Sequence, residues 1–211
     1  MPLKRLFDIF VSTVAILILF PLLLSVGALV RIESKGPSLF RQTRIGLRGR
    51  PFTLLKFRSM SVHERSDPGF TPGATARVTR VGVWIRRTKV DELPQLWNVL
   101  VGDMSLVGPR PEVPEWTKVH PERWRTILSV RPGLTDAASL EFRHEEALLA
   151  ASKDPESTYR DEILPRKLDL AEAYVRDRSF LGDLTLLFVT ARAVLATGTG
   201  FHAPDGGESP R

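Results

Sequence analysis

The stretch "IFVSTVAILILFPLLLSVGALV", residues 9–30, decides the fold, because its 22 residues include no charged side chain. A helix rises about 1.5 Å per residue, so this length can cross the roughly 30 Å hydrocarbon core of a bilayer. Pro21 lies near the middle, and a proline inside a helix removes a backbone donor and kinks or breaks the helix. The halves on either side, about 18 Å and about 15 Å long, are each too short to span the core.

Basic side chains flank this run on both sides. Lys4 and Arg5 precede it, and six more cations follow it, namely Arg31, Lys35, Arg41, Arg44, Arg48 and Arg50. Positive flanks favour the cytoplasmic side, so both ends of the run are expected on one face of the membrane. A re-entrant helix bent at Pro21 fits the length, the proline and the charges together, while a transmembrane helix and a secretory signal peptide remain as alternatives.

Polar residues in and beside the run have expected positions of their own. Ser12, Thr13 and Ser25 are expected to bond carbonyl groups freed at the bend, as a kinked helix in lipid requires. Asp8 is expected at the membrane interface, near the basic residues that precede it, because a carboxylate inside lipid is costly.

The net charge of +6 is concentrated at one end of the chain. Residues 1–60 sum to +8 and residues 61–211 to −2. Such an asymmetry indicates either nucleic acid or an anionic membrane surface as a partner, and the adjoining apolar run favours the membrane. The absence of cysteine excludes disulfides, thiolate zinc sites and cysteine nucleophiles, and the four histidines show no metal-ligand spacing.

Beyond the apolar run, the sequence predicts an α+β fold that is mostly helical. A short β-hairpin is expected, with strands at residues 38–43 and 51–57 and with Gly46 and Gly49 in the turn. Residues 61–76 are expected to form a loop that could act as a lid, and residues 102–114 an extended loop stiffened by proline. Apolar spacing predicts helices at residues 81–88, 91–101, 122–130, 141–152, 163–178 and 181–196.

The expected organisation is an anchor followed by one domain. Residues 1–35 form the re-entrant anchor, residues 36–197 a catalytic domain continuous with it, and residues 198–211 a disordered tail rich in Gly, Pro and Ser. The last predicted helix contains Asp183 and Arg192 and is too short to span a bilayer. It is expected to lie against the membrane as an amphipathic interfacial helix or to pack in the core.

The segment "KVDELPQLWNVL", residues 89–100, places Asp91 and Glu92 side by side where an apolar helical stripe begins. In the structural interpretation, Asp91 caps that helix and Glu92 stabilises its first turn. The functional interpretation rests on the cations nearby in sequence, which are Lys56, Arg58, Arg80, Arg86, Arg87 and Arg110. Paired carboxylates beside many cations suit phosphate chemistry with Mg²⁺, and a carboxylate can also attack phosphorus as a nucleophile.

Side chains would have to bind the phosphate, because the chain has no P-loop, G-x-G-x-x-G or H-E-x-x-H motif. Arg110 stands between Pro109 and Pro111, whose fixed φ angles lower the entropy cost of aiming its guanidinium group. Lys56 lies at the end of a predicted strand and is expected to point away from the core. An ordinary surface arginine and a solvated strand lysine remain as alternatives.

Taken in order, the motifs resemble those of a known family. A proline-broken hydrophobic hairpin followed by "FRQTRIGLRGRPF", "LKFRSM", "TRVGVWIRRTKVDELPQLWNVLVGDMSLVGPRPE" and "RPGLTDAAS" closely resembles the bacterial sugar transferases. These are monotopic phosphoglycosyl transferases, which begin glycan assembly on a polyprenyl phosphate. The likeness covers roughly residues 3–195 and is most specific at residues 79–112. It suggests the short, single-domain form without an extra N-terminal membrane bundle.

The resemblance implies roles for the matching residues. Asp91 would attack the sugar-linked phosphate of a UDP-sugar, expel UMP and form a covalent phosphosugar–enzyme intermediate. Glu92 would hold Mg²⁺ against the diphosphate, with Asp91 as a second metal ligand. Polyprenyl (undecaprenyl) phosphate would then attack the intermediate to give a polyprenyl-diphospho-sugar. The phosphate- and substrate-binding residues would be Lys56, Arg58, Arg80, Arg86 and Arg110, and Pro21 would form the bend of the membrane helix.

Two residues depart from the family pattern. Lys89 stands where a small residue is common, and Phe20 stands where a serine usually precedes the bend proline. Neither residue takes part in the implied chemistry.

The implied setting is the cytoplasmic face of the inner membrane. UDP-sugar, polyprenyl phosphate and membrane lipids would be the partners and Mg²⁺ the cofactor, while a homo-oligomer is left open. No nucleic acid is expected, because the chain lacks basic repeats interleaved with aromatic residues. Two functional alternatives stay open: the same transfer by direct attack of the lipid phosphate without a covalent intermediate, and a non-enzymatic basic scaffold bound to the membrane.

Overall fold

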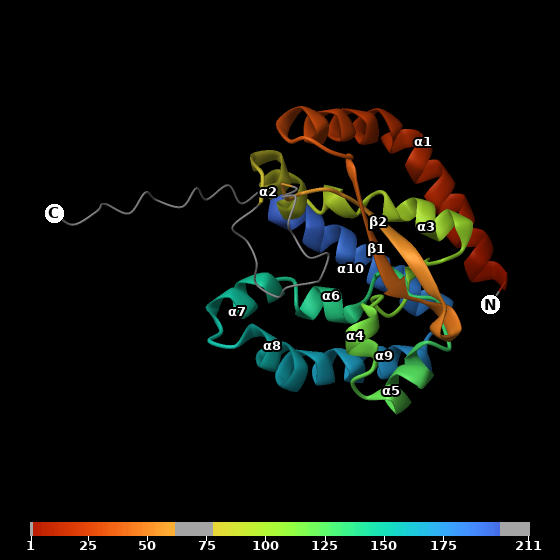
Figure 1. Cartoon of the computed structure of the whole chain (residues 1–211). Coiled ribbons are helices and arrows are strands. Elements are labelled where there is room, and N and C mark those ends of the chain that lie inside the picture. The colour runs from red at the N-terminus through yellow and green to blue at the C-terminus, as the bar shows by residue number, and fades with distance from the viewer. Residues whose placement is uncertain (1, 62–77, 199–211) are drawn as a thin grey trace.

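The computed structural model describes residues 2–61 and 78–198, with side chains through residue 193 (Figure 1). This part of the chain is mostly helical, with a short antiparallel hairpin and a long apolar N-terminal helix, and it confirms the predicted fold class. The loop predicted at residues 61–76 and the tail predicted at residues 198–211 lie almost entirely outside the described residues.

The apolar run forms most of helix α1 (Pro2–Glu33), which continues through Pro21. Figure 1 shows α1 bent between its two arms. A single proline removes one backbone hydrogen bond, so it bends a long helix without ending it. The Ser25 hydroxyl donates to the Pro21 carbonyl at 2.9 Å, and Ser12 and Thr13 bond the carbonyls of Asp8 and Ile9. In these contacts none of the three bonds the Leu17 carbonyl, which is the one that Pro21 leaves without its helical donor.

The prediction for Asp8 is wrong, because its carboxylate is buried in the protein, with 2% of the residue exposed. It accepts hydrogen bonds from the Ser105 hydroxyl at 2.8 Å and from the Leu106 amide at 3.2 Å. One turn earlier, Lys4 forms an ion pair with Asp183. A buried carboxylate is stable when its oxygens are hydrogen-bonded, and these contacts dock the first turns of α1 onto the protein.

The predicted hairpin is present. Strands β1 (Leu39–Ile45) and β2 (Pro51–Phe57) pair antiparallel from Leu39 opposite Phe57 to Ile45 opposite Pro51. The outer edge of β2 is covered by Asn98, whose side chain accepts from the Leu55 amide at 3.1 Å and donates to the Thr53 carbonyl at 2.8 Å. This amide holds the hairpin, and with it Lys56, against helix α3 (Gln95–Val101).

A second, parallel sheet lies where the sequence predicted only an extended loop. Strand β3 (Ser105–Val107) pairs with β4 (Gly133–Thr135). Each strand has only three residues, too few to show the alternation by which strands are recognised. A Cβ atom on Gly133 would overlap the Gly108 backbone, so only glycine permits this close crossing.

Two predicted helices are shorter in the structure. The helix predicted at 91–101 is a 3₁₀ turn, η2 (Val90–Glu92), followed by α3. The helix predicted at 141–152 is the shorter α7 (Glu145–Ala151), and it is separated by residues 142–144 from a helix that was not predicted, α6 (Ala137–Glu141). The other helical elements are α2 (Arg80–Arg87), α4 (Pro114–Thr117), α5 (Pro121–Ile127), α8 (Pro155–Thr158), the π-helical turn η3 (Tyr159–Ile163), α9 (Leu164–Asp177) and α10 (Phe180–Gly198), with a 3₁₀ turn η1 (Leu47–Gly49) between the hairpin strands.

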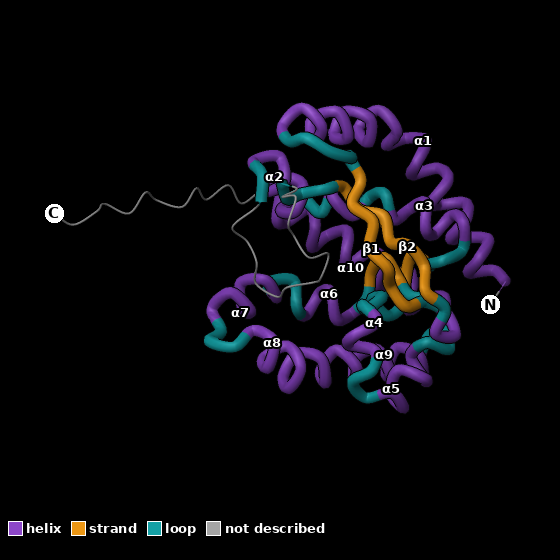
Figure 2. Tube along the Cα trace, in the orientation of Figure 1, coloured by secondary structure: helices purple, strands orange, loops and turns teal. Residues whose placement is uncertain are grey.

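The core has three parts. In Figure 2 the hairpin lies between α1 with α3 on one side and α5 with α8 and α9 on the other. One apolar cluster joins α5 to α9, and a second joins α3 and β3 to the first arm of α1. The third packs Val26 and Val30, from the second arm of α1, against Phe57 of β2 and Ile85 of α2. Both arms of α1 therefore pack on the same domain.

Much of α1 faces outward. It is the helix, among the described residues, that is long and apolar enough to cross a membrane, and only 11% of its most apolar window is buried in the protein. Exposed large apolar side chains continue on α2, α3 and α10, namely Val83, Trp84, Trp97, Val101, Leu181, Phe188 and Val189. An apolar surface this extensive is typical of a membrane-associated protein.

Candidate active site

The acidic pair lies in η2, between two backbone features that fix its orientation. Lys89, which precedes the first residue of η2, has φ 58° and ψ 14°, the left-handed conformation that glycine adopts most easily. Pro94 precedes the first residue of α3 and serves as its N-cap. The structural interpretation of the sequence is therefore wrong, because Asp91 does not cap α3.

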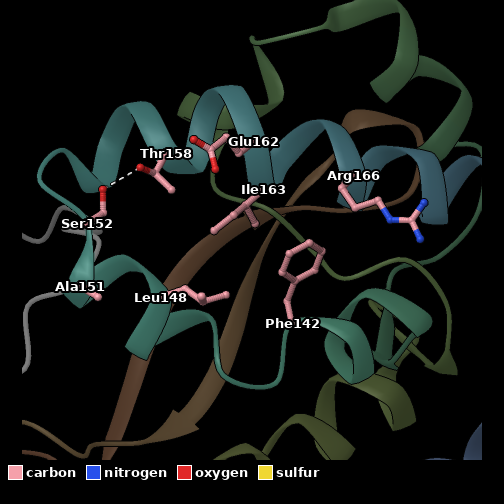
Figure 3. A pocket seen from close by; sticks show the side chains of 8 residues that line it. All are labelled: Phe142, Leu148, Ala151, Ser152, Thr158, Glu162, Ile163 and Arg166. Atoms are coloured by element: carbon pink, nitrogen blue, oxygen red, sulfur yellow. Dashed lines mark hydrogen bonds between the residues drawn. The ribbon is translucent and has the colours of Figure 1, made fainter.

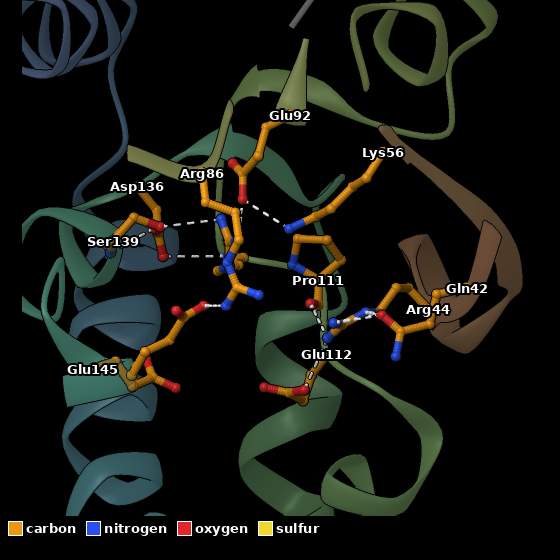
Figure 4. A network of polar contacts seen from close by, with 12 residues as sticks. Gln42, Arg44, Lys56, Arg86, Glu92, Pro111, Glu112, Asp136, Ser139 and Glu145 are labelled. Atoms are coloured by element: carbon orange, nitrogen blue, oxygen red, sulfur yellow. Dashed lines mark hydrogen bonds and ion pairs between the residues drawn. The ribbon is translucent and has the colours of Figure 1, made fainter. Parts of the chain in front are cut away.

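Glu92 is held between two cations from distant parts of the chain (Figure 4). Its Oε1 atom accepts from Lys56 Nζ at 2.8 Å and from Arg110 Nη2 at 2.6 Å. Burial raises the pKa of this carboxyl group, but the charges of Arg110 and Lys56 outweigh burial and hold the pKa well below its usual value. Glu92 is therefore ionised at neutral pH.

Asp91 is in the opposite situation. It is 9% exposed, and its Oδ1 atom is buried without a hydrogen-bond partner in the part of the chain that the structure describes. Burial raises the pKa of Asp91, and the negative charge of Glu92 raises it further, while Lys56, Lys89 and Arg86 oppose the rise. A buried, unpaired carboxylate oxygen is costly, and such groups often mark functional sites.

Arg110 is oriented from three sides. Its backbone amide donates to Asp136 Oδ2 at 3.2 Å, and its guanidinium group donates to Glu92 and, at 3.5 Å, to the Ser139 hydroxyl. Glu92 is the main cause that raises the pKa of Arg110 above its usual value. The sequence analysis missed Asp136 and Ser139, although Asp is a preferred helix N-cap residue, and Asp136 does cap α6 by accepting from the Ser139 amide.

The hairpin supports the Arg110 segment from the other side. Arg44 on β1 donates to the Pro111 carbonyl at 3.1 Å and to Glu112 Oε1 at 3.0 Å, and the Tyr159 hydroxyl donates to Glu112 Oε2 at 2.5 Å. These contacts connect β1, the segment after β3 and η3, and Figure 4 shows those of Arg44. Sequence reasoning had no signal for them, because the partners are distant in the chain.

Arg86 of α2 lies beside Glu92 in Figure 4, and it forms an ion pair with Glu146 of α7. Its charge is among those that lower the pKa of Asp91. The structure thus brings together Lys56, Arg86 and Arg110 around the pair, as the sequence predicted.

The other two predicted phosphate-binding residues have different surroundings. Arg58 is buried, and its guanidinium group donates to carbonyl groups at the end of α1 rather than to the acidic pair. Arg80 is exposed at the start of α2, and the hydrogen bond recorded for it is made by its backbone amide, with Glu33. Among the described contacts, neither guanidinium group joins the cation set around Glu92. For Arg58 this corrects the sequence prediction, because its guanidinium group is bonded elsewhere, whereas phosphate binding by Arg80 stays a prediction.

The carboxylate pair is compatible with Mg²⁺, although the described residues include no group of three or more potential ligand side chains. Mg²⁺ commonly binds one or two carboxylates and takes its remaining ligands from water and substrate phosphate. Among the described residues, Asp91 Oδ1 has no hydrogen-bond partner, and the two side-chain bonds to Glu92 both use Oε1. Each carboxylate therefore keeps an oxygen atom for a cation.

An open surface pocket lies elsewhere, between α6 and α7 on one side and α8 and α9 on the other (Figure 3). Phe142, Leu148 and Ile163 supply its apolar part, and Ser152 and Thr158 at one end are hydrogen-bonded at 2.7 Å. None of the residues around the acidic pair lines it. The chemistry of this protein is expected at the carboxylate pair instead.

Fold and site together define a helical α+β domain that carries a membrane-type helix and an acidic pair among cations. The family model of bacterial sugar transferases matches residues 1–197. The chain belongs to the bacterial sugar transferase family, as the sequence motifs indicated.

Several curated proteins are similar. The chain is 38% identical to the uncharacterized sugar transferase EpsL of Bacillus subtilis (strain 168), with 93% of this chain and 89% of that protein covered. It is 38% identical to the exopolysaccharide production protein PSS of Rhizobium leguminosarum bv. phaseoli, with 94% and 98% covered. It is 37% identical to the UDP-glucose:undecaprenyl-phosphate glucose-1-phosphate transferase of Klebsiella pneumoniae, with 89% of this chain but only 39% of that protein covered.

Proposed function

We propose that this protein is a phosphoglycosyl transferase that moves a sugar-1-phosphate from a UDP-sugar to polyprenyl phosphate and releases UMP, as the first step of membrane glycan assembly. The proposal rests on one observation above all. Asp91 keeps a buried oxygen atom without a partner, next to a Glu92 that two cations hold ionised. Relatives are named for transfer of glucose-1-phosphate or N-acetylgalactosamine phosphate to undecaprenyl phosphate, which supports the same reaction class.

In the first half-reaction, a carboxylate oxygen of Asp91 attacks the sugar-linked phosphorus. The bond from this phosphorus to the bridging oxygen breaks, and the electron pair leaves with UMP, which gives an acyl phosphate on Asp91. In the second, a phosphate oxygen of the polyprenyl phosphate attacks the same phosphorus, and the bond to Asp91 breaks. The product is the polyprenyl-diphospho-sugar, and Asp91 is regenerated as a carboxylate.

The cations around the pair stabilise the charge that both steps carry. Lys56 and Arg110 lie within hydrogen-bond distance of Glu92, and Arg86 contributes to the potential at Asp91. Fixed cations aimed at a transferring phosphoryl group are a main source of catalysis in such reactions. Glu92 and Asp91 would hold Mg²⁺, which when bound supplies Lewis-acid stabilisation of the diphosphate.

The membrane topology belongs to the same proposal. The first turns of α1 bond to β3 and α10 through Asp8 and Lys4, while its second arm packs on Phe57 and Ile85. Both ends of α1 are thus fixed to one domain, which a helix crossing the bilayer would not allow. A re-entrant helix with the domain on the cytoplasmic face lets UDP-sugar arrive from water and polyprenyl phosphate from the leaflet.

The test is UMP release by the purified protein with a panel of UDP-sugars, a short polyprenyl phosphate and Mg²⁺. Asp91→Asn is expected to lose at least about a thousandfold in turnover, because an amide cannot act as the nucleophile. Mass spectrometry of the wild type with UDP-sugar alone is expected to show a phosphosugar adduct on Asp91. Turnover without any adduct would favour direct attack by the lipid phosphate, and no UMP release with any donor would favour a scaffold.

A further inference from the structure

The end of α1 is bonded to the strand that carries Lys56. Arg58, two residues further along, is only 5% exposed and donates to the Lys35 carbonyl at 2.8 Å and to the Ser34 carbonyl and hydroxyl at 2.6 Å and 2.8 Å. Carbonyl groups after the last turn of a helix lack intrahelical donors, and the helix C-terminus favours a positive charge. The guanidinium group of Arg58 therefore hydrogen-bonds the residues that follow α1 and fixes the distance between the end of α1 and β2.

The same end of α1 is bonded to the helix that carries Arg86. Glu33, its last residue, accepts from the Arg80 amide at 2.8 Å and from the Val81 amide through both carboxylate oxygens, at 3.2 Å and 3.0 Å. Amides in the first turn of a helix have no acceptor within the helix, and a negative charge is favourable there. Glu33 thus supplies a partner for the start of α2 from another element.

The two contacted elements also pack directly on each other. The Thr79 amide, just before α2, donates to the Ser59 carbonyl, just after β2, at 3.1 Å. A Cβ atom on Gly82 would overlap that same carbonyl, so the backbones of α2 and of the residue after β2 are in close contact that a larger residue would prevent. The end of α1, the end of β2 and the start of α2 therefore form one joint.

We propose that Arg58 and Glu33 are positioning residues, which set the phosphate-binding cations Lys56 and Arg86 at a fixed place relative to the end of the membrane helix. Arg58 acts through Lys56, and Glu33 acts through Arg86. The inference rests on the proposed function, because it takes these two cations as ligands of the substrate diphosphate. It also gives Arg58 a role different from direct phosphate binding.

The first experiment compares Arg58→Lys and Glu33→Gln with the control Lys35→Gln in the full chain. Lys35 lies in the same joint, but the structure uses its backbone carbonyl and leaves its side chain exposed. The Kd for UDP with Mg²⁺ is expected to rise about tenfold in Arg58→Lys, which loses the planar fork, and about threefold in Glu33→Gln, which keeps an acceptor but loses the charge. The control is expected to stay within about twofold.

The KM for UDP-sugar is expected to rise in parallel with these Kd values, with smaller changes in kcat per folded enzyme. A merely structural role would lower the melting temperature and the folded fraction while KM and Kd stayed at wild-type values. That result in Arg58→Lys and Glu33→Gln would overturn the proposal. Because Glu33 is on the surface, its variant is expected to fold even if Arg58→Lys does not.

The pairing of roles gives a second readout. With Lys56→Met as background, Arg58→Lys is expected to add less than about twofold to the Kd, while Glu33→Gln keeps its full effect. With Arg86→Gln as background, Glu33→Gln is expected to add less than about twofold to the Kd, while Arg58→Lys keeps its full effect. Effects that multiply in both backgrounds would contradict the assignment.

The two proposals fail in different ways. Wild type that binds UDP with Mg²⁺ but transfers nothing to polyprenyl phosphate would reject the proposed function and leave the binding comparison intact. Wild type that transfers sugar phosphate while both variants bind like the control would reject the positioning roles alone. Wild type that binds no UDP would reject both.

Discussion

Asp91 and Glu92 are neighbours in the chain, yet their surroundings shift their pKa values in opposite directions. Glu92 shares one oxygen between two cations, whereas Asp91 is buried with an oxygen that accepts no hydrogen bond in the described structure. An ion-paired acid keeps its charge near neutral pH and can hold a metal. A buried carboxylate oxygen that accepts no hydrogen bond is poorly stabilised, which is compatible with the nucleophilic role proposed for Asp91.

At the residue scale, the buried charge of Asp91 predicts a trade between stability and activity. Because its folded-state pKa is raised, its ionised form at neutral pH destabilises the native state. In the absence of Mg²⁺, Asp91→Asn is therefore expected to raise the free energy of unfolding by about 0.5–2 kcal/mol and to melt at a higher temperature than wild type. The same variant is expected to lose transfer activity. Thermal unfolding with a chelator present measures this. Asp177→Asn, at an exposed site, is the control; an Asp91 variant less stable than wild type would count against the argument.

For Glu92 the shift in pKa predicts how its contribution to the stability of the fold changes with pH. Its folded-state pKa is lowered, so its contribution to stability is present above the unfolded-state value of about 4.3 and is lost as the pH falls through the folded value. The stability difference between wild type and Glu92→Gln, measured without Mg²⁺, is therefore expected to shrink from about pH 5 to about pH 3. Urea unfolding at several pH values tests this, and a difference that does not change with pH would exclude the ion-paired carboxylate.

At the scale of elements, the short parallel sheet positions the site. The residues after β3 lead to Arg110, and those after β4 lead to Asp136, so the pairing of the two strands brings the arginine and its anchor together. In Gly133→Ala the added methyl group would overlap the Gly108 backbone and push the two chain segments apart. We expect a loss of about 2–4 kcal/mol of stability, together with a higher KM for UDP-sugar in the folded fraction.

Circular dichroism melting and UMP-release kinetics measure these two effects. Gly49→Asn is the matched control, because no atom lies within 4 Å of a Cβ at that position and asparagine tolerates its positive φ of 73°. Equal behaviour of the two variants would show that the glycine crossing does not position Arg110.

These elements also show what the sequence could predict. The hairpin and the long helices have apolar periodicity or turn glycines, and the acidic pair and its three cations, Lys56, Arg86 and Arg110, are recognisable by charge and motif. The parallel strands are too short to show a pattern. Asp136 and Glu33 act through contacts with residues 26 and 47 positions away, and local sequence carries no signal for such pairings.

At the scale of the whole molecule, α1 is part of the domain rather than an appendage. Its N-terminal turns contribute Lys4 and Asp8 to polar contacts with α10 and β3, and its C-terminal turn accepts from Arg58. Between these ends, outward-facing apolar residues follow the bend at Pro21. The domain therefore holds both ends of α1, the membrane-type helix, and the same domain carries the acidic pair.

This arrangement predicts that both ends of α1 face the same side of the membrane, and the basic residues on both flanks predict that this side is the cytoplasm. The chain has no cysteine, so Pro2→Cys and Lys35→Cys each introduce a single label site, one before and one after the apolar run, and the side chain of Lys35 is exposed. In inside-out membrane vesicles both are expected to react with a membrane-impermeant maleimide, and in intact spheroplasts neither, because the contacts at the two ends fix them to the same domain. A cysteine placed at the exposed Leu17, within the bend region, is expected to be protected in both preparations. Labelling of the two ends from opposite sides would establish a helix that crosses the membrane, and it would require the contacts of Lys4 and Asp8 with the domain to be broken.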